Sequence, residues 1–478
     1  ELPETLVFDF PTLRQIEAHL SAQVPGAGAQ PSKAREDGQA LVSSIARAAA
    51  RASSSEQSST PSLTICGMGC QLPGGVNAII ELERKVSVAC DLVVEVPFSR
   101  WAAGDVPSEV APCLARRVRH GAFVDAAQLF DHAHFSVSPA EAAAMDPQQR
   151  LLLERGYAAL HGGGSTRRNL LGSGTGVAVG IYATEFTHVL AQSPLGRSAY
   201  ASTGASLSIA SGRLSFVLGL QGPCASFDTA CSASLVACHS AARALQHSEC
   251  ALHLVAGVNL MLLQASSIGL AIAGMTSPSG RSHTFDSRAD GFARGEGAST
   301  VGLACKGGEL GTVSGSAVRQ DGRSASLTAP NGRAQQGLLR AGLADASAVP
   351  GELTLNEAHG TGTDLGDPIE VGSLAAAILG ARSGEQALAF GGVKGCLGHG
   401  ESTAGATGLL TLVLGLQGAR AGPNVHLRSL NPKVGRSLRS NALVLPVQPA
   451  VLCAAVRVGG VSSFGYSGTI AHAALRDA

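Results

Sequence analysis

Short apolar segments alternate with longer stretches of helical periodicity along most of the chain. Apolar runs predict strands at residues 176–180, 224–227, 253–257, 353–356 and 387–392. Apolar residues at helical spacing predict helices at residues 138–156, 232–246, 335–343 and 403–416. The first helix has Ser138 at its N-cap, Pro139 at its first position and Glu141 closing a capping box. This alternation indicates an α/β fold with buried, largely parallel strands. We find no short-period repeat, although a diverged duplication of half the fold would escape inspection.

The first part of the chain differs in composition from the rest. Residues 1–24 contain an apolar segment followed by a short amphipathic stretch. Residues 25–61 are rich in Ala, Ser, Gly and Gln and include two serine runs, a composition typical of a flexible linker. We therefore expect the folded body to cover residues 62–478.

The overall composition excludes several classes of partner. The formal net charge is +0, so neither nucleic acid nor an anionic membrane is indicated. No apolar run is long enough to span a membrane, and no secretory signal is visible. Charged residues make up 15% of the chain, against about 25% in typical soluble domains. One explanation for this low content is a partner subunit that covers much of the surface.

The cysteines argue against a metal site and against a disulfide framework. The chain has 11 of them, scattered along its length. Cys66 and Cys70 are the closest pair, and no second pair at zinc-ligand spacing accompanies them. We therefore expect no metal, and a cytoplasmic or other reducing intracellular compartment.

Cys231 is the candidate nucleophile. It lies among small residues between the predicted strand at 224–227 and the predicted helix at 232–246. A helix N-terminus lowers the pKa of a thiol, and small neighbours leave room for a bulky acyl group. Taken alone, the residue is equally consistent with a small buried hydrophobe.

Two histidines in glycine-rich turns change the interpretation of this cysteine. His359 lies in the turn at residues 356–368, and His399 lies in the turn at residues 392–405. Each turn follows a predicted strand, where sites form in α/β folds. One thiol and two imidazoles suit acyl transfer followed by carbon–carbon bond formation. The thiolate accepts an acyl group, and two imidazole N–H groups stabilise the enolate left when a malonyl unit loses carbon dioxide.

Several further motifs accompany these three turns. They lie at residues 67–75, 97–101, 144–154, 284–286, 289–297 and 460–469. Together with the three turns, they closely resemble the β-ketoacyl synthase (ketosynthase) domain of modular type I polyketide synthases, over nearly all of residues 62–478. By the same comparison, residues 1–24 resemble the C-terminal tail of an acyl carrier protein domain.

The resemblance implies a fold, a reaction and partners. The fold is the five-layered α/β/α/β/α thiolase fold, built from two related halves and acting as a homodimer. The reaction is decarboxylative Claisen condensation of an acyl chain on Cys231 with malonyl-acyl carrier protein. His359 and His399 then form the pair that promotes decarboxylation and stabilises the enolate. The body needs no bound cofactor, since a phosphopantetheine arm on the carrier protein delivers the substrates. Further polyketide synthase domains are expected in the parent chain.

Other residues receive supporting roles from the resemblance. Lys394 matches a lysine that pairs with an acidic residue, and Glu401 matches a glutamate of the same turn. Thr361 and Thr363 match threonines that hydrogen-bond the phosphopantetheine arm. Phe464 matches a phenylalanine that gates the pocket. Its backbone amide, with that of the nucleophile, is expected to form the oxyanion hole.

The sequence departs from the family pattern in three places, of which Ala233, where a serine is common, is a mild change. Cys396 replaces an asparagine in the turn that carries His399, and Ile470 replaces an asparagine in the last motif. Both changes remove a polar group that could support a loop, and neither removes a reacting group.

Two alternatives to elongation stay open. One is a non-elongating ketosynthase that only accepts and transfers acyl chains, although such domains usually lack a catalytic histidine. The other is a structural module that dimerises a synthase and docks carrier domains.

Overall fold

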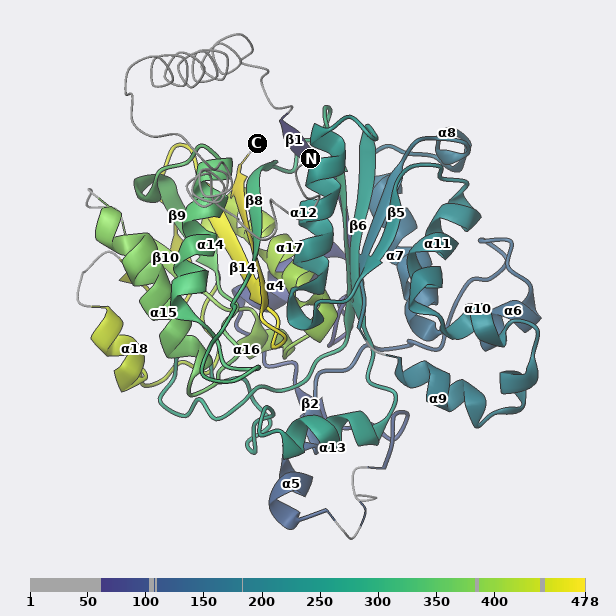
Figure 1. The fold of residues 1–478 in the computed structure, drawn as a ribbon, viewed down its shortest axis with the longest axis horizontal. Helices are drawn as coiled ribbons and strands as arrows, with labels where there is room; N and C mark the ends of the chain where they lie inside the picture. The colour runs from purple at the N-terminus through teal and green to yellow at the C-terminus, as the bar shows by residue number, and fades with distance from the viewer. Residues whose placement is uncertain are drawn as a thin grey trace, which may run out of the picture. The chain divides into compact units, whose positions relative to one another are not determined.

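The computed structural model describes residues 62–102, 107, 110–182, 184–382, 387–438 and 443–477. The predicted carrier-domain tail at 1–24 and the linker at 25–61 lie outside these residues. Within the described ranges, strands and helices alternate as the sequence predicts (Figure 1).

One mixed sheet of eleven strands runs through the described part of the chain. Its first half has the order β5-β4-β6-β7-β1, formed by β1 (Leu63–Gln71), β4 (Gly176–Gly180), β5 (Cys224–Phe227), β6 (Leu252–Asn259) and β7 (Gly297–Ala304). Its second half has the order β10-β9-β14-β15-β8, formed by β8 (Thr312–Gln320), β9 (Leu353–Glu357), β10 (Leu388–Gly391), β14 (Val458–Phe464) and β15 (Thr469–Arg476). The short strand β12 (Leu443–Val444) extends the sheet beyond β10.

The two halves have the same topology. In the first, β4 pairs in parallel with β5 and β6, and β7 joins β6 to β1 by antiparallel pairing. In the second, β9 pairs in parallel with β10 and β14, and β15 joins β14 to β8 in the same antiparallel way. Antiparallel pairing of β1 with β8 connects the halves. The chain is therefore built from two related halves, although its sequence shows no repeat.

The expectation of a largely parallel sheet is wrong for four strands, β1, β7, β8 and β15. Strands β7 and β15 are buried along nearly their whole length. They therefore read as continuous runs of apolar and small residues, which carry no signal of strand direction.

Helices form three layers around the two half-sheets. Helices α12 (Ala233–Gln246) and α17 (Ala404–Gln417) pack against each other between the halves. Helices α7 (Pro147–Gly162) and α11 (Leu207–Leu218) cover the first half, and α14 (Gly332–Asp345), with α15 (Gly366–Ala377) against it, covers the second (Figure 1). This is the α/β/α/β/α arrangement of the predicted thiolase fold.

The remaining described elements are shorter. The helices are α4 (Ile79–Ser87), α5 (Pro112–Arg117), α6 (Pro139–Ala144), α8 (Arg167–Leu170), α9 (Glu185–Ala191), α10 (Ala201–Ala205), α13 (Gln264–Ile272), α16 (Lys394–Leu397) and α18 (Pro432–Ser437). Short 3₁₀ turns are η1 (Pro194–Arg197), η2 (Ala230–Ser232), η3 (Pro350–Glu352), η4 (Leu379–Ala381) and η5 (Glu401–Thr403). Two small antiparallel pairs join β2 (Val94–Glu95) to β3 (His120–Gly121) and β11 (Arg420–Ala421) to β13 (Ala450–Val451). No helix among the described residues has the length and apolar character needed to cross a bilayer.

The helix predicted at residues 138–156 is in fact two helices. It breaks before Pro147, because proline lacks an N–H and disfavours helical backbone in the residue before it. Asp146 then caps the second helix. Ser138 caps the first as predicted, accepting a hydrogen bond from the Glu141 N–H. The Glu141 carboxylate does not close a capping box, because it forms an ion pair with Arg213.

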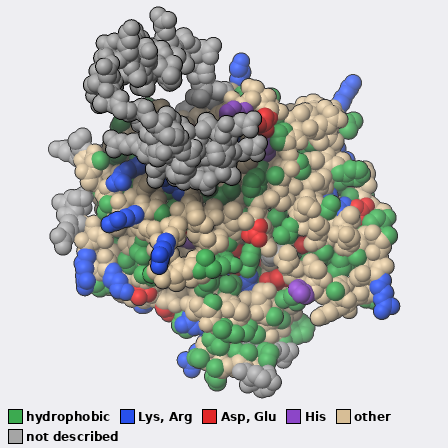
Figure 2. Space-filling model, in the orientation of Figure 1, with side chains coloured by type: hydrophobic (Ala, Val, Ile, Leu, Met, Phe, Trp, Pro, Cys, Tyr) green, Lys and Arg blue, Asp and Glu red, His purple; other side chains and the backbone are tan. Residues whose placement is uncertain are grey.

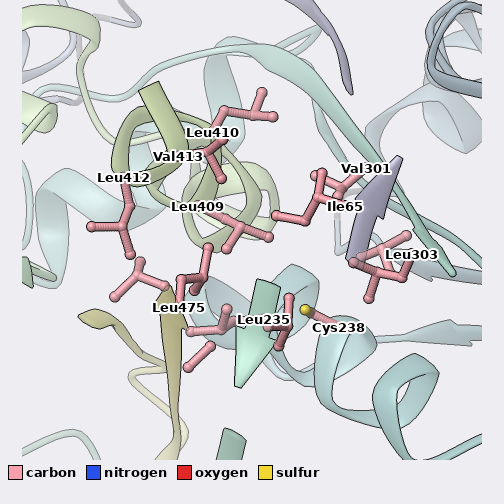
Figure 3. Close-up of a cluster of buried hydrophobic side chains, with 14 of the residues drawn as sticks. Ile65, Leu235, Cys238, Val301, Leu303, Leu409, Leu410, Leu412, Val413 and Leu475 are labelled. Carbon is pink, nitrogen blue, oxygen red and sulfur yellow. The ribbon is translucent and has the colours of Figure 1, made fainter. Parts of the chain in front are cut away.

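A large apolar cluster lies around the central helices. Leu409 of α17 is 0% exposed and lies at the centre of this cluster, near Ile65 and Leu475 (Figure 3). The packing therefore joins β1 in the first half to β15 in the second through a central helix.

Leu409→Ala is expected to lower the free energy of unfolding by about 2–5 kcal/mol, because it leaves a cavity in this cluster. Denaturant unfolding measures the loss. Leu327→Ala is the control, since Leu327 is 85% exposed. Equal losses in the two variants would contradict the packing described.

Candidate active site

Cys231 lies at the corner between β5 and α12. The turn η2 holds it there, and Ala230 adopts a left-handed backbone with φ of 53° just before it. The Ser463 hydroxyl donates a hydrogen bond of 2.7 Å to the Cys231 carbonyl oxygen. This bond ties the corner of the first half to β14 of the second, so the two halves meet at the nucleophile.

A cavity of about 330 Å³ opens at this corner. The predicted site residues that line it are Cys231, His359, Thr361, Thr363, His399, Glu401 and Phe464. Lys394 does not line the cavity and is 4% exposed in the adjacent helix α16. The fold thus brings together residues that are far apart in the sequence.

His399 contacts the thiol directly. Its Nε2 lies 3.0 Å from the Cys231 Sγ. Burial raises the pKa of Cys231 to about 12, with a further contribution from the charge of Glu401. Burial, followed by the positive charges of Lys394 and Arg294, holds the pKa of His399 well below its usual value. Both groups are therefore neutral at neutral pH, joined by one hydrogen bond.

Burial opposes the expectation of a resting thiolate at Cys231, because it raises the pKa of the thiol. The thiol must lose its proton as it attacks, and the His399 imidazole is within reach to accept that proton.

His359 presents a defined tautomer to the same cavity. The Phe464 backbone N–H donates a hydrogen bond of 3.3 Å to its Nδ1. Since Nδ1 accepts, the proton of the neutral ring is on Nε2. Burial, followed by the charge of Lys394, keeps the pKa of His359 well below its usual value. Its ring centroid lies 5.6 Å from that of His399, with the rings nearly perpendicular at 88°.

Two carboxylates that the sequence patterns left without a role hold the turn of His359. Glu370 accepts hydrogen bonds from the backbone N–H groups of His359 and Gly360, at 2.7 and 2.8 Å. Asp367 accepts one from the Gly362 N–H at 3.0 Å. Both carboxylates belong to α15. Acidic residues in the first turns of a helix directly after a glycine-rich loop were the signal that could have identified them.

The two threonines of this turn lie side by side. Their hydroxyl oxygens are 3.2 Å apart, and Thr363 also accepts a hydrogen bond from the Gly366 N–H. Thr361 and Thr363 both line the cavity. Their contact with a phosphopantetheine arm stays a prediction.

Lys394 interacts with carboxylates other than Glu401. Burial lowers its pKa, and the nearby charges of Glu357 and Glu370 act in the opposite direction. Within the described ranges, Lys394 forms no ion pair with Glu401, which is engaged by Arg294 instead. The expected pairing of the lysine with an acidic group therefore takes the form of longer-range attraction.

Arg294 is a further residue that the sequence patterns left without a role. Its Nε lies 2.5 Å from Glu401 Oε1 and its Nη2 lies 3.1 Å from Oε2. Both side chains are almost fully buried. Arg294 belongs to the motif at residues 289–297, whose sequence alone gives no role for any of its side chains.

Two of the departures from the family pattern are accommodated by apolar packing. Cys396 is 1% exposed in the main apolar cluster, and its carbonyl oxygen accepts a hydrogen bond of 3.0 Å from the Leu92 N–H. Ile470 is 0% exposed and belongs to the same small cluster as Phe464. Each replacement therefore places an apolar side chain in apolar surroundings.

Nothing in the described ranges resembles a metal centre, since no cluster of three or more His, Cys, Asp or Glu side chains has a suitable arrangement.

Two family models of β-ketoacyl synthases match most of the chain. Residues 61–306 match the beta-ketoacyl synthase N-terminal domain, and residues 310–428 match the beta-ketoacyl synthase C-terminal domain.

Similar curated proteins are polyketide synthases. The chain is 39% identical over 98% of its length to a phenolphthiocerol/phthiocerol polyketide synthase of Mycobacterium tuberculosis, and it spans 24% of that protein. It is 38% identical over 100% of its length to polyketide synthase GfsA of Streptomyces halstedii, of which it spans 6%. The chain therefore spans a quarter or less of these relatives.

Solved structures similar to this chain are ketosynthases. The ketosynthase from module 6 of the bacillaene synthase of Bacillus subtilis 168 has a TM-score of 0.78 and 32% identity, covering 87% of this chain and 72% of that one. An oxazolomycin ketosynthase domain from Streptomyces albus has a TM-score of 0.81 and 29% identity, covering 87% and 74%.

Proposed function

Since the chain belongs to the β-ketoacyl synthase family, we propose that it extends polyketide chains by decarboxylative Claisen condensation. The acyl chain is held on Cys231, and the extender is a malonyl unit on an acyl carrier protein. One observation carries the proposal. The Cys231 Sγ, the His399 Nε2 at 3.0 Å and the protonated Nε2 of His359 share one cavity.

The first half-reaction is transfer of the acyl chain to the enzyme. The Cys231 sulfur attacks the thioester carbonyl of the incoming carrier while its proton passes to His399. Collapse of the tetrahedral intermediate releases the carrier thiol, which takes up that proton. We assign the oxyanion hole to the Cys231 and Phe464 amides. The Phe464 N–H donates a long hydrogen bond of 3.3 Å to His359 Nδ1. It can give up this bond and donate to the oxyanion instead.

The second half-reaction forms the carbon–carbon bond. The malonyl carboxylate leaves as carbon dioxide, and its electron pair forms an enolate at the thioester. The Nε2–H of His359 stabilises the enolate oxygen, and His399 adds a second donor when its neutral ring is in the tautomer with the proton on Nε2. The enolate carbon attacks the acyl group and expels the Cys231 thiolate, which takes up one proton from solvent. No cofactor is needed in this cycle.

Carrier protein and neighbouring synthase domains are the partners. Thr361 and Thr363 line the cavity, which supports assigning them to the phosphopantetheine arm as hydrogen-bond partners. Phe464 also lines the cavity and is assigned as its gate. We assign residues 62–478 to the ketosynthase, residues 25–61 to a linker and residues 1–24 to the end of a carrier domain. The 11 cysteines are all free thiols, which supports a reducing intracellular compartment.

Dimerisation is part of the proposal. Strand β5 forms one end of the sheet, so one edge is unpaired by the described residues, and its first two residues are exposed. The adjacent helix α11 exposes Phe216 by 85%. Lys and Arg side chains gather mainly toward the left and the rim of the face drawn in Figure 2, and hydrophobic side chains lie across its middle and right. An unpaired strand edge beside apolar surface favours pairing with a second copy.

The chain is therefore expected to be a dimer at micromolar concentration in light scattering. Phe216→Asp is expected to shift the population toward monomer. Phe98→Asp, at an equally exposed phenylalanine on a different part of the chain, is the control and should stay dimeric. A monomeric native chain, or equal dissociation of both variants, would contradict this interface.

A single incubation tests the proposed reaction. The protein is mixed with an acyl thioester and malonyl-acyl carrier protein, and both the acyl-enzyme and the β-ketoacyl product are followed by mass spectrometry. Elongation predicts both species. Acylation alone would favour a non-elongating ketosynthase, and absence of acylation would favour a docking module.

A further inference from the structure

The backbone of His399 is held from both sides by the segment before β7. The His399 N–H donates a hydrogen bond of 2.7 Å to the Ala293 carbonyl, and the Gly295 N–H donates one of 2.8 Å to the His399 carbonyl. The Phe292 ring packs against the imidazole in a T-shaped arrangement, with ring centroids 4.9 Å apart and an interplanar angle of 89°. Residues 292–295 therefore form a clamp on the catalytic turn.

The imidazole itself has little other support. Its Nδ1 is buried and has no hydrogen-bond partner among the described residues. Its Nε2 faces the Cys231 sulfur, which is a reacting atom. The direction of the ring thus depends on the turn that carries it, and not on a bond to its distal nitrogen.

Arg294 connects the clamp to the same turn through its side chain. It forms a two-pronged ion pair with Glu401, two residues after His399, and its Nη1 donates to the Ser267 hydroxyl at 2.7 Å. Glu185 adds a second carboxylate at 3.7 Å. Glu401 has φ of 49°, a left-handed backbone that non-glycine residues rarely adopt. Arg294 thus braces a strained residue next to the catalytic histidine.

The ion pair also sets the charge beside the reacting atoms. Glu401 lines the cavity, and an unbalanced carboxylate there would oppose formation of the thiolate. Besides Arg294 and Glu401, the titratable groups that face His399 are Cys231, His359 and Lys394. Arg294 is therefore the counter-charge for Glu401, the carboxylate in the His399 turn that lines the cavity.

We propose that Arg294 is a positioning residue. Through Glu401 and the backbone of residues 293–295 it holds the His399 imidazole against Cys231 and balances the Glu401 charge. This inference rests on the proposed function only for the role of His399 in the reaction.

The test is a double-mutant cycle between Arg294 and His399. Arg294→Gln is made in the native chain and in the His399→Ala variant, and the rates of Cys231 acylation and of condensation are measured for all four proteins. In the native background, Arg294→Gln is expected to slow both steps by about 10–100-fold, because a small displacement of a catalytic group has effects of this size. In the His399→Ala background, it is expected to slow them less than about threefold, since the group it positions is gone.

Three further variants separate positioning from folding. Arg213→Gln breaks another arginine–glutamate ion pair, between a buried arginine and a partly exposed glutamate outside the cavity, and should change the rates less than about twofold. Arg294→Lys keeps the charge without the two-pronged contact and should recover part of the rate. Glu401→Gln should slow acylation and condensation as Arg294→Gln does. If thermal unfolding shows that Arg294→Gln does not fold, Glu401→Gln takes its place as the test of the proposal.

A separate measurement tests whether Arg294 balances the charge of Glu401. Without Arg294, the unbalanced Glu401 carboxylate raises the pKa of the Cys231 thiol, so the pH profile of its alkylation by iodoacetamide should move to higher pH. An unchanged profile, native rates in Arg294→Gln, or the same fold loss with and without His399 would each overturn the proposal. Acylation and alkylation do not require condensation. A chain that fails to condense therefore rejects the proposed function and still tests Arg294.

Discussion

Cys231→Ala is expected to abolish acylation of the chain and to lower the rate of condensation by about 10⁴-fold or more. The thiol is the only nucleophile in contact with an imidazole in the described cavity, at 3.0 Å from His399 Nε2. Without it, no covalent acyl intermediate forms, and the enolate has no partner held in place. Intact-protein mass spectrometry after incubation with an acyl thioester measures the first effect, and the yield of β-ketoacyl product measures the second.

Cys238→Ala is the matched control. Cys238 lies on the same helix, α12, and is 1% exposed in the apolar core. Its loss removes a buried thiol without touching the cavity, so acylation should persist. The Cys231→Ala variant keeps both histidines and should still decarboxylate malonyl-acyl carrier protein slowly. Acylation of this variant at another residue would show that the nucleophile is misassigned.

The two histidines are expected to separate the two half-reactions. His359→Ala should lower the rate of condensation by about 10²–10³-fold, the cost of removing one donor to a developing oxyanion. It should leave acylation of Cys231 within about threefold of native, because its Nδ1 contacts the Phe464 amide and no hydrogen bond joins it to the thiol. His399→Ala should slow both steps, since this imidazole contacts the sulfur directly.

Pre-steady-state measurements of acylation and of condensation check the predictions for His359→Ala and His399→Ala. Acyl-enzyme formation is followed without malonyl-acyl carrier protein, and product formation is followed after the acyl-enzyme has been isolated. If His359→Ala slowed acylation as much as His399→Ala did, the assignment of separate roles would be wrong.

Local patterns in the sequence predicted most of the elements around the site. The predicted strands at 176–180 and 224–227 match β4 and β5, and the helix predicted at 403–416 differs from α17 by one residue at each end. These segments have short-range signals, namely a run of small apolar residues or a helical period that ends at glycine. The glycine-rich turns were visible for the same reason, since turn residues are local.

Long-range partners could not be predicted in the same way. Arg294 and Glu401 are far apart in the chain, and each lies in a turn whose sequence gives no indication of its partner. The contact between His399 and the thiol likewise depends on the two halves meeting across α12 and α17. The sequence therefore assigned both histidines to the second half-reaction, and the contact with the thiol is the basis for proposing a role for His399 in the first.

The burial of Cys231 was the other property that local sequence patterns could not predict. Small side chains around Cys231 indicated access for an acyl group, but the degree of desolvation depends on the packed surroundings. Because desolvation raises the pKa of the thiol to about 12, the proposed mechanism depends on a group that accepts the thiol proton. The same burial explains why neutral imidazoles are available as hydrogen-bond donors.

The most direct test of the proposed condensation is a single turnover with acyl-enzyme prepared in advance. The native chain is acylated on Cys231, freed of excess thioester and mixed with malonyl-acyl carrier protein. We predict that acyl-enzyme disappears as β-ketoacyl-acyl carrier protein and carbon dioxide appear in equal amounts. An acyl-enzyme that persists, or that is lost only by hydrolysis or back-transfer with no β-ketoacyl product, would contradict this prediction.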